Sequence, residues 1–323
     1  MGRCRRGVGT DPYVFLVGCF RRAHARSVTA TVTAQRYDTI SFLSDYGTRD
    51  EFVGIVKCVI ADIAPQARVI DLTHEVPPFD VRAGSLALAR CISYVPTGIV
   101  LAVVDPGVGT ERRGVAISVG GGRGILIGPD NGLLSMGTAL AGGAESAVVL
   151  NNPEFQLAAP GATFAGRDVF APAAAHLCNG VPLSELGDPV DPNLLLPGVV
   201  PLSRVEHDGV VAEITWVDRF GNCQLNVGPE EVASFGSVLS VAWNTAMGER
   251  STRSATVVGN FSAIGGGVGL VVDSFGMLAI AVDRGSAAEQ LSIGVGDAVT
   301  LSALSDESVL TTNVQLRRGP SST

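Results

Sequence analysis

The stretch Thr-Ile-Ser-Phe-Leu-Ser-Asp-Tyr-Gly-Thr at residues 39–48 predicts how this chain begins to fold. Residues 39–43 are mostly β-branched or apolar, as in a buried strand, and the run ends in an Asp-Tyr-Gly turn. Helical spacing of apolar residues follows over 52–63, and Pro65 marks the end of that helix. A strand followed by a helix is typical of an α/β layered domain.

The alternation of strands and helices continues after this first pair. We expect strands at 68–72, 99–104, 115–119 and 125–127, a helix at 83–95, and a loop that enters a helix at 164–177. These elements predict an α/β N-terminal domain with a central sheet over residues 38–200. Ligands of such sheets bind at the carboxyl ends of the strands, where Asp45 and Asp105 are expected to lie.

The pattern changes beyond residues 196–209, which contain prolines and glycine and are predicted to be a linker. The rest of the chain has short apolar runs separated by turn residues, which predicts a smaller, mostly-β C-terminal domain over residues 205–323. The expected strands are Val210–Val217, Val238–Trp243, Gly269–Val272, Leu278–Val282 and Ala298–Leu304.

Composition excludes several classes of protein. With 323 residues, 46% of them hydrophobic, the chain can bury a sizeable core, so wholesale disorder is excluded. Its net charge is −8, although residues 1–36 hold seven arginines and a single acidic residue. The remainder is therefore more acidic than the total, which argues against a nucleic-acid partner. An uncharged apolar stretch of about 18 residues is lacking, so we expect no membrane partner.

Residues 1–37 are predicted to be a disordered or non-native extension. The alternatives are a targeting segment, since a short apolar run at 13–20 is flanked by arginines, or a packed element. The six cysteines form no C-x-x-C pair and are interpreted as reduced thiols of a cytoplasmic protein. The four histidines form no H-x-x-x-H, and Lys57 does not belong to a Walker loop, so the motifs indicate neither a metal nor a cofactor.

Four polar clusters could carry chemistry. Asp45, just past a strand end, could bind a ribose diol or form an Asx turn that caps the next helix. Asp105 follows a very apolar strand and needs a partner, for which Arg112 is the candidate; a purely structural ion pair is the alternative. Residues 163–168 could be a helix start capped by Asp168. Residues 218–222 and 273–276 could hold an amine, an adenine edge and a ring face, but turns are rich in such residues anyway.

Taken together and in order, these motifs resemble the S-adenosylmethionine hydroxide adenosyltransferases, also called S-adenosylmethionine hydrolases. These hydrolases are related to fluorinating and chlorinating enzymes that use the same substrate. The resemblance runs from Asp38 to Leu304, and it is carried by residues 44–47, 71–74, 105–113, 129–133, 164–168 and 218–222.

The resemblance implies an α/β N-terminal domain and a β-barrel-like C-terminal domain. It also implies a homotrimer with active sites at subunit interfaces. Water or hydroxide attacks C5′ of the ribose and displaces methionine, which gives adenosine and L-methionine. Neither a metal nor a cofactor is required.

Residue by residue, Asp105 and Arg112 match the aspartate and arginine of the family's Asp-Arg-His catalytic set. The motif Phe-His-Gly-Arg-Asp reads Phe-Ala-Gly-Arg-Asp at residues 164–168, so Ala165 stands at the histidine position. Alanine neither donates, accepts nor titrates, so we expect hydrolysis to be impaired. Fluorinating relatives have serine at the position of Gly166 and tyrosine at that of Asp105.

The resemblance also assigns substrate contacts. Asp45 matches the carboxylate that binds the ribose diol, Asp218 the residue that holds the methionine amine, and Asn222 an asparagine that binds adenine. Phe275 stands where the halogenating relatives have arginine, which leaves the partner of the methionine carboxylate open. The further residues assigned to substrate binding are Gly166, Phe220, Ser274 and Arg284.

Two other functions compete with hydrolysis. A non-catalytic adenosine- or S-adenosylmethionine-binding protein is favoured by Ala165. Halide-dependent 5′-halogenation is opposed by Asp105, because a carboxylate repels an incoming halide. Asp71 and His74 are expected to brace the N-terminal domain, and residues 130–132 to form a structural turn.

Overall fold

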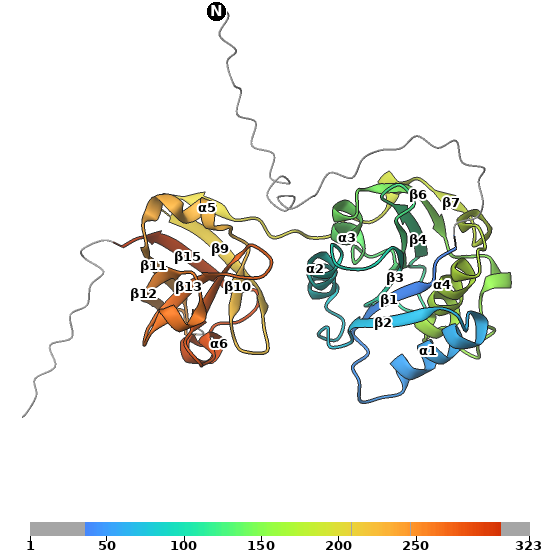
Figure 1. Cartoon of the computed structure of the whole chain (residues 1–323), viewed down its shortest axis with the longest axis horizontal. Coiled ribbons are helices and arrows are strands. Elements are labelled where there is room, and N and C mark those ends of the chain that lie inside the picture. Colours follow the sequence, from blue (N-terminus) through green and yellow to red (C-terminus); the bar gives the residue numbers. More distant parts are fainter. Residues whose placement is uncertain (1–35, 208, 246, 305–323) are drawn as a thin grey trace, which may run out of the picture. The chain divides into compact units, whose positions relative to one another are not determined.

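The computed structural model describes residues 36–304 apart from 208 and 246, and these form two compact units that divide between Val200 and Pro201 (Figure 1). Each unit is described by itself. The predicted extension over 1–37 lies outside the described residues, except for Arg36 and Tyr37.

Within the described residues of the N-terminal unit, seven strands form one sheet in the order β2-β1-β3-β5-β4-β6-β7. Strands β2, β1, β3 and β5 are parallel, and the other three extend the sheet in antiparallel fashion. The bounds are β1 Thr39–Ser44, β2 Arg68–Thr73, β3 Gly98–Val103, β4 Gly114–Val119, β5 Gly124–Pro129, β6 Ala144–Val149 and β7 Pro189–Val190.

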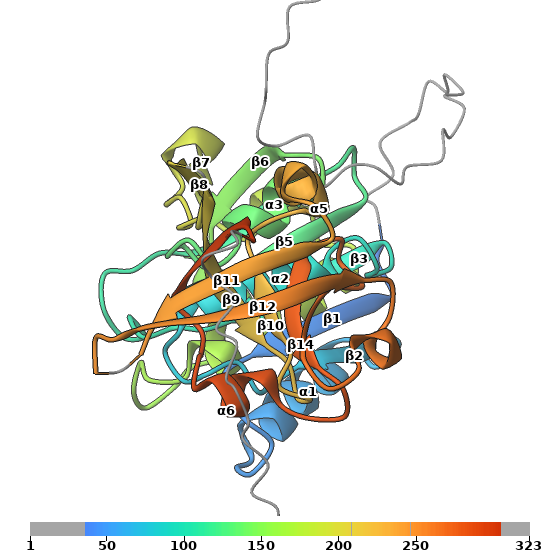
Figure 2. The same cartoon turned by 90° about the vertical axis from the view of Figure 1, so that its left-hand side faces the viewer.

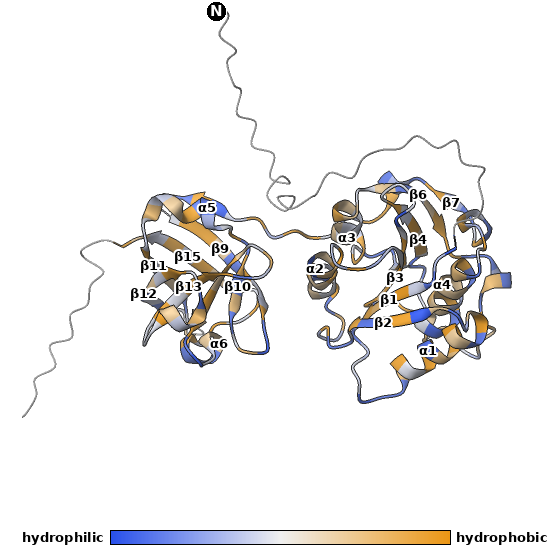
Figure 3. Ribbon diagram, viewed as in Figure 1, coloured by the Kyte–Doolittle hydropathy of each residue, from blue (hydrophilic) through white to orange (hydrophobic). Residues whose placement is uncertain are grey.

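Helices cover both faces of this sheet (Figure 1). The helices are α1 (Phe52–Ile63), α2 (Val81–Cys91), α3 (Ser135–Leu140) and α4 (Ala171–Cys178). Helices α1 and α4 pack together against one core cluster, which includes Leu101, whereas α2 and α3 pack against another, which includes Ala102. Neighbouring residues of a strand face opposite sides of the sheet, so the fully apolar β3 is buried by both helix layers (Figure 3).

The N-terminal unit confirms the predicted α/β class and differs in detail. Helix α2 begins at Val81 rather than 83, because the Asp80 side chain accepts the N–H of Ala83 and caps it. The segment 164–177 was expected to be a loop that enters a helix. The helix is confirmed as α4, and the residues before it form a π-helical turn, Gly166–Phe170, rather than a loop. Strands β6 and β7 were not predicted.

The C-terminal unit is mostly β, as predicted. In its described residues, β10 pairs with both β9 and β14, which closes a barrel of seven strands, and β8 adds an edge to β9. Figure 2 looks onto this unit, with the antiparallel β11 and β12 across its front. The bounds are β8 Arg204–Glu206, β9 Gly209–Val217, β10 Cys223–Leu225, β11 Val238–Asn244, β12 Arg250–Val258, β13 Val268–Val272, β14 Leu278–Val282, β15 Ala298–Ala303, α5 Pro229–Val232 and α6 Ala287–Leu291.

Two features of the C-terminal unit correct the expectations. The predicted linker at 196–209 includes β8, whose Arg204 is paired with Val211 of β9. Strand β12 was missed because its sequence, Arg-Ser-Thr-Arg-Ser-Ala-Thr-Val-Val, is largely polar and only Ala255 is buried. A strand of this kind forms because its backbone pairs with β11 and β13 on either side.

The buried Leu101 in the middle of β3 provides a test of this layering. Leu101→Ala should lower the free energy of unfolding by about 2–5 kcal/mol, because it leaves a cavity between the sheet and the α1–α4 layer. Urea unfolding followed by far-UV circular dichroism measures this loss. Fluorescence reports the C-terminal unit alone, since both tryptophans, Trp216 and Trp243, lie there.

The matched control is Tyr94→Ala. Its side chain is 75% exposed, so the change should alter the free energy of unfolding by no more than about 0.5 kcal/mol. Equal losses in the two variants would contradict the layered core described above.

Candidate functional site

Asp45 and Asp105 come together at the carboxyl edge of the parallel sheet. Strands β1 and β3 are neighbours in register, with Ser44 beside Val103, and the Asp45 N–H donates to the Val103 carbonyl at 3.3 Å. The chain leaves β1 through α1 on one face and enters β3 from α2 on the other. This is a topological switch point, where open α/β sheets bind their ligands.

Asp105 forms a buried ion pair. Its Oδ2 accepts from Nη2 of Arg112 at 2.6 Å, and the two side chains are only 6% and 13% exposed. The Arg112 guanidinium also lies over the Phe170 ring, 5.4 Å from its centroid. The predicted partnership of Asp105 and Arg112 is thus confirmed.

Each member of this pair keeps an unused polar atom. In the described part of the chain, Oδ1 of Asp105 and Nε of Arg112 are buried and make no hydrogen bond of normal geometry, although the backbone N–H of Gly107 is close enough to the Asp105 carboxylate to lower its pKa. Burial raises the pKa of the Asp105 carboxyl, and the Arg112 charge offsets part of that rise. Buried polar atoms without partners are costly, which is typical of functional sites rather than of simple braces.

Asp45 is fixed by a residue that the sequence analysis missed. Its Oδ2 accepts the backbone N–H of Phe79 at 2.9 Å, and burial raises the pKa of its carboxyl. Phe79 has a φ of +69°, which is unfavourable for a bulky residue, and its ring is largely exposed. The Pro-Pro-Phe-Asp segment between β2 and α2 was the available signal. Asp45 does not cap α1, so that alternative for Asp45 is excluded.

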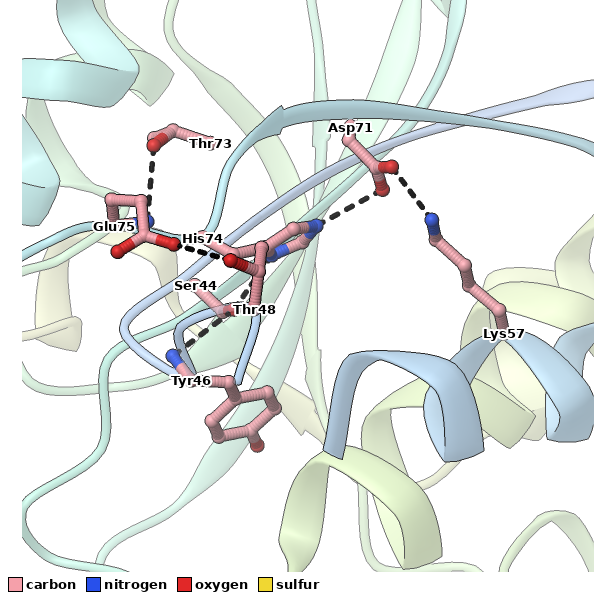
Figure 4. Close-up of polar contacts among 8 residues, drawn as sticks. All are labelled: Ser44, Tyr46, Thr48, Lys57, Asp71, Thr73, His74 and Glu75. Carbon is pink, nitrogen blue, oxygen red and sulfur yellow. Dashed lines mark hydrogen bonds and ion pairs between the residues drawn. The ribbon is translucent and has the colours of Figure 1, made fainter. Parts of the chain in front are cut away.

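A chain of hydrogen bonds holds the turn after β1 (Figure 4). The Ser44 hydroxyl lies 2.8 Å from Nδ1 of His74, and Nε2 of His74 lies 3.0 Å from Asp71, which also binds Lys57 at 2.6 Å. Ser44 accepts the backbone N–H of Tyr46. Burial raises the pKa of Asp71, but the hydrogen bonds from His74 and Lys57 outweigh it and the pKa is lowered.

This chain has the residue types of a serine hydrolase triad but not its geometry. In that triad the nucleophile faces Nε2 of the histidine, whereas Ser44 faces Nδ1 and is fully buried. A carboxylate only accepts, so the Nε2–H of His74 donates to Asp71. The predicted bracing role of Asp71 and His74 is confirmed.

Ala165 and Gly166 lie against Tyr46. The Tyr46 hydroxyl is so close to Gly166 that a β-carbon there would overlap it, which requires glycine at this position. Ala165 is half-buried, precedes the π-helical turn and packs on the core next to Tyr46. Asp168 binds Arg167 at 2.6 Å and does not cap the helix, so the capping alternative for Asp168 is wrong.

In the C-terminal unit, Asp218 and Asn222 form one tight turn between β9 and β10. Asp218 accepts the N–H groups of Phe220 and Asn222 at 2.8 and 2.9 Å, and the Asn222 amide donates to its other oxygen at 2.8 Å. The Phe220 ring is 75% exposed beside them. This turn thus presents a carboxylate, an amide and an aromatic ring together.

Ser274 and Arg284 lie at opposite ends of β14. The pairing of Cys223 with Ile280 puts the 218–222 turn at the end of β14 that leads to Arg284. Ser274 belongs to the turn before β14, where Asp273 accepts the N–H of Phe275. The structure therefore brings Arg284 toward Asp218 and Asn222 within this unit. The turn that contains Ser274 contacts the strands that flank the 218–222 turn, because Gln224 donates to Asp273 and the Trp216 ring packs edge-on against Phe275.

Several other groups are accounted for by the fold. Asn131 donates to the Val104 carbonyl at 2.9 Å and Asp130 binds Arg113, so the turn at 130–132 is structural, as expected.

Burial raises the pKa of Cys178 and Cys223 to about 12, so these free thiols are inert core residues. Over the described residues there is no cluster of three or more potential metal ligands, and no helix long and apolar enough to span a membrane.

Comparison with known proteins extends these observations. Residues 40–187 match the N-terminal domain model of the SAM hydroxide adenosyltransferases, and residues 212–300 match the C-terminal domain model. A protein named (R)-S-adenosyl-L-methionine hydrolase from Salinispora arenicola is 45% identical over 264 residues, which cover 82% of this chain and 97% of the relative. A protein named fluorinase from an Actinoplanes species is 28% identical and covers 81% and 96% of the two chains.

A solved structure gives the same result for the fold. An uncharacterized conserved protein from Thermotoga maritima superposes with a TM-score of 0.73 at 35% identity, over 81% of this chain and 99% of that one. The resemblance noted in the sequence is confirmed, and the chain belongs to the SAM hydroxide adenosyltransferase family.

Proposed function

We propose that this chain hydrolyses S-adenosyl-L-methionine to adenosine and L-methionine. The observation that carries the proposal is the buried carboxylate of Asp105, with one oxygen bound to Arg112 and the other unpartnered, beside Asp45 at the switch point. The name of the 45% identical relative supports the same reaction.

The reaction does not require a general acid to protonate the leaving group. The leaving group is a thioether on a sulfonium, and it departs neutral when the C5′–S bond breaks and its electron pair stays on sulfur. The difficult partner is water, which must be oriented in line with C5′ and lose a proton. A single positioned base is therefore the main chemical requirement.

Asp105 and Arg112 meet that requirement as a pair. Oδ1 of Asp105 accepts a proton from the attacking water, and Arg112 fixes the carboxylate through Oδ2. Burial makes the carboxylate a better base, while the guanidinium keeps it ionised. Ala165 lacks the polar group of the family's histidine, so turnover is slower than with a complete set.

Substrate contacts follow the same residues. Asp45 binds the ribose diol, because one of its oxygens is held by Phe79 and its side chain remains partly accessible. Asp218 binds the methionine amine, while Asn222 and Phe220 contact adenine. The enzyme acts as a cytoplasmic homotrimer with active sites between subunits, without nucleic-acid or membrane partners. The family resemblance supports the contacts and the trimer, whereas the acidic charge, the lack of a long apolar stretch and the cysteine pattern support the expected partners and location.

Halogenation is not supported by the site. Gly166 cannot carry a serine side chain while Tyr46 occupies its present position. The Asp105 carboxylate would also repel a halide at the point of attack.

Product analysis tests the proposal directly. Incubation with S-adenosylmethionine should yield adenosine and methionine in equal amounts, and Asp105→Asn should lower kcat by about 10²–10⁴ because the amide cannot take the proton. Chromatography measures adenosine. Asp62→Asn, a change at an exposed acid of α1, is the control and should leave kcat unaltered.

Three outcomes would overturn this proposal. The first is 5′-chloro-5′-deoxyadenosine formation in the presence of chloride. The second is adenosine binding without turnover, which would indicate a binding protein. The third is an unchanged rate in Asp105→Asn.

The pH dependence tests the Asp105–Arg112 pair. Activity requires ionised Asp105, so kcat/KM should fall as pH falls through its pKa, and burial places this acid limb above the ordinary aspartate value. Arg112→Gln removes the charge that lowers this pKa, so the limb should move to higher pH.

Arg113→Gln is the matched control for that profile. Arg113 binds Asp130 rather than Asp105, so its loss should leave the acid limb where it is. If both variants shift the limb equally, Arg112 has no special relation to the base.

Position 165 can be tested by restoring the histidine. Ala165→His should raise kcat by tenfold or more, because a positioned polar group is typically worth about 10²–10⁴ when it acts as acid or base. Ala165→Leu adds bulk without polar atoms and should give no gain. No increase with histidine would show that position 165 does not contribute to turnover.

A further inference from the structure

The Tyr46 ring, one residue after Asp45, is held rigidly by its neighbours. It makes edge-on contacts with Phe42 of β1 and with Phe164, at centroid distances of 6.5 and 5.7 Å, and a tilted contact with Phe52 of α1 at 5.7 Å. Its backbone N–H is bound to Ser44, and its ring points away from the Ser44–His74 chain (Figure 4). Three aromatic rings and the backbone therefore fix where the hydroxyl lies.

The hydroxyl lies directly against Gly166, next to Ala165. Across the described residues this hydroxyl makes no hydrogen bond, and Tyr46 is only partly buried, so its oxygen stays accessible to water or a ligand. The charged groups that act on it are Asp45, Asp105, Arg112 and Asp168, and the first three belong to the site proposed above. A fixed, unpaired hydroxyl in this position suggests a role toward a bound molecule.

The protonation state of the Tyr46 hydroxyl determines whether it can act as a hydrogen-bond donor or as a base. Burial, together with the nearby Asp45 and Asp105 carboxylates, raises the pKa of Tyr46 well above the ordinary tyrosine value. The phenol therefore keeps its proton wherever the enzyme operates. It is available as a hydrogen-bond donor and not as a base.

We propose that Tyr46 is a catalytic residue of this chain, whose hydroxyl donates a hydrogen bond to the water that Asp105 activates. It supplies a polar group beside position 165, where this chain has alanine. The inference rests on the proposed hydrolysis.

The geometry of one water molecule explains the effect. The water donates one O–H to Asp105 and accepts from Tyr46 on one lone pair, which leaves its second lone pair for C5′. The O–C5′ bond then forms as the C5′–S bond breaks, Asp105 takes the water proton, and Tyr46 keeps its own. The Tyr46 hydrogen bond fixes the orientation of the water, so that its free lone pair points along the line of the breaking C5′–S bond when the proton leaves.

The test is Tyr46→Phe in the full chain. The ring and its packing remain, and only the donor is lost. We expect kcat to fall about tenfold, with KM for S-adenosylmethionine and the Kd for adenosine unchanged. Tyr37→Phe is the matched control: that phenol is also buried in the N-terminal unit but donates to the Gly122 carbonyl at 3.4 Å, so kcat should not change.

A double-mutant cycle supplies a second measurement. Ala165→His should raise kcat by a larger factor in the Tyr46→Phe background than in the wild-type chain, because the new imidazole then replaces an absent donor. A purely structural Tyr46 would give equal factors in both backgrounds.

The outcomes separate the two proposals. If the wild-type chain forms no adenosine, the proposed function fails and this inference fails with it. If the wild-type chain is active and Tyr46→Phe has the same kcat, only the role of Tyr46 is overturned. A loss of adenosine binding in Tyr46→Phe would also overturn it, since it would assign the hydroxyl to binding or folding.

Discussion

The parallel pairing of β1 with β3 is the constraint on which the N-terminal site depends. It joins two segments about sixty residues apart in the sequence, and the hydrogen bond from the Asp45 N–H to the Val103 carbonyl carries the pairing one step past the strand end. Asp45 and Asp105 meet for that reason. The chain connections leave the sheet on opposite faces at this point, which is where open α/β sheets bind their ligands.

The Asp105–Arg112 pair illustrates how function opposes stability here. Burying two charges costs desolvation free energy, and their attraction offsets this cost only when the geometry is good. Removing one partner of such a pair typically costs about 3–5 kcal/mol of stability, because the other charge is left buried alone. A structural pair would normally satisfy its remaining atoms. Here Oδ1 of Asp105 and Nε of Arg112 stay unpartnered among the described residues, which is the arrangement that a polar substrate or water would complete.

Tyr46, Ala165 and Gly166 form one local arrangement that must be understood together. The Tyr46 ring fills the space between α1 and the start of the π-helical turn, and its hydroxyl excludes any side chain larger than hydrogen at 166. The departure from the family's pattern at position 165 therefore occurs beside an unpaired phenol. The hydrogen bonds among Ser44, His74 and Asp71 fix the backbone of the turn after β1. They therefore also hold Asp45 and Tyr46, which belong to this turn.

The sequence by itself determined the α/β class of the first unit and the mostly-β class of the second, because periodicity and turn residues are local properties. It also determined the partnership of Asp105 with Arg112, since a carboxylate after an apolar strand needs a nearby cation. The sequence did not predict β12, because its side chains are largely polar and the strand forms through backbone pairing on both edges. Only the tertiary structure decided that Phe79 holds Asp45, that Tyr46 requires Gly166, and that Phe275 packs against Trp216 near the 218–222 turn. These contacts join residues from separate elements, and their distances depend on how strands and helices pack, which local sequence does not encode.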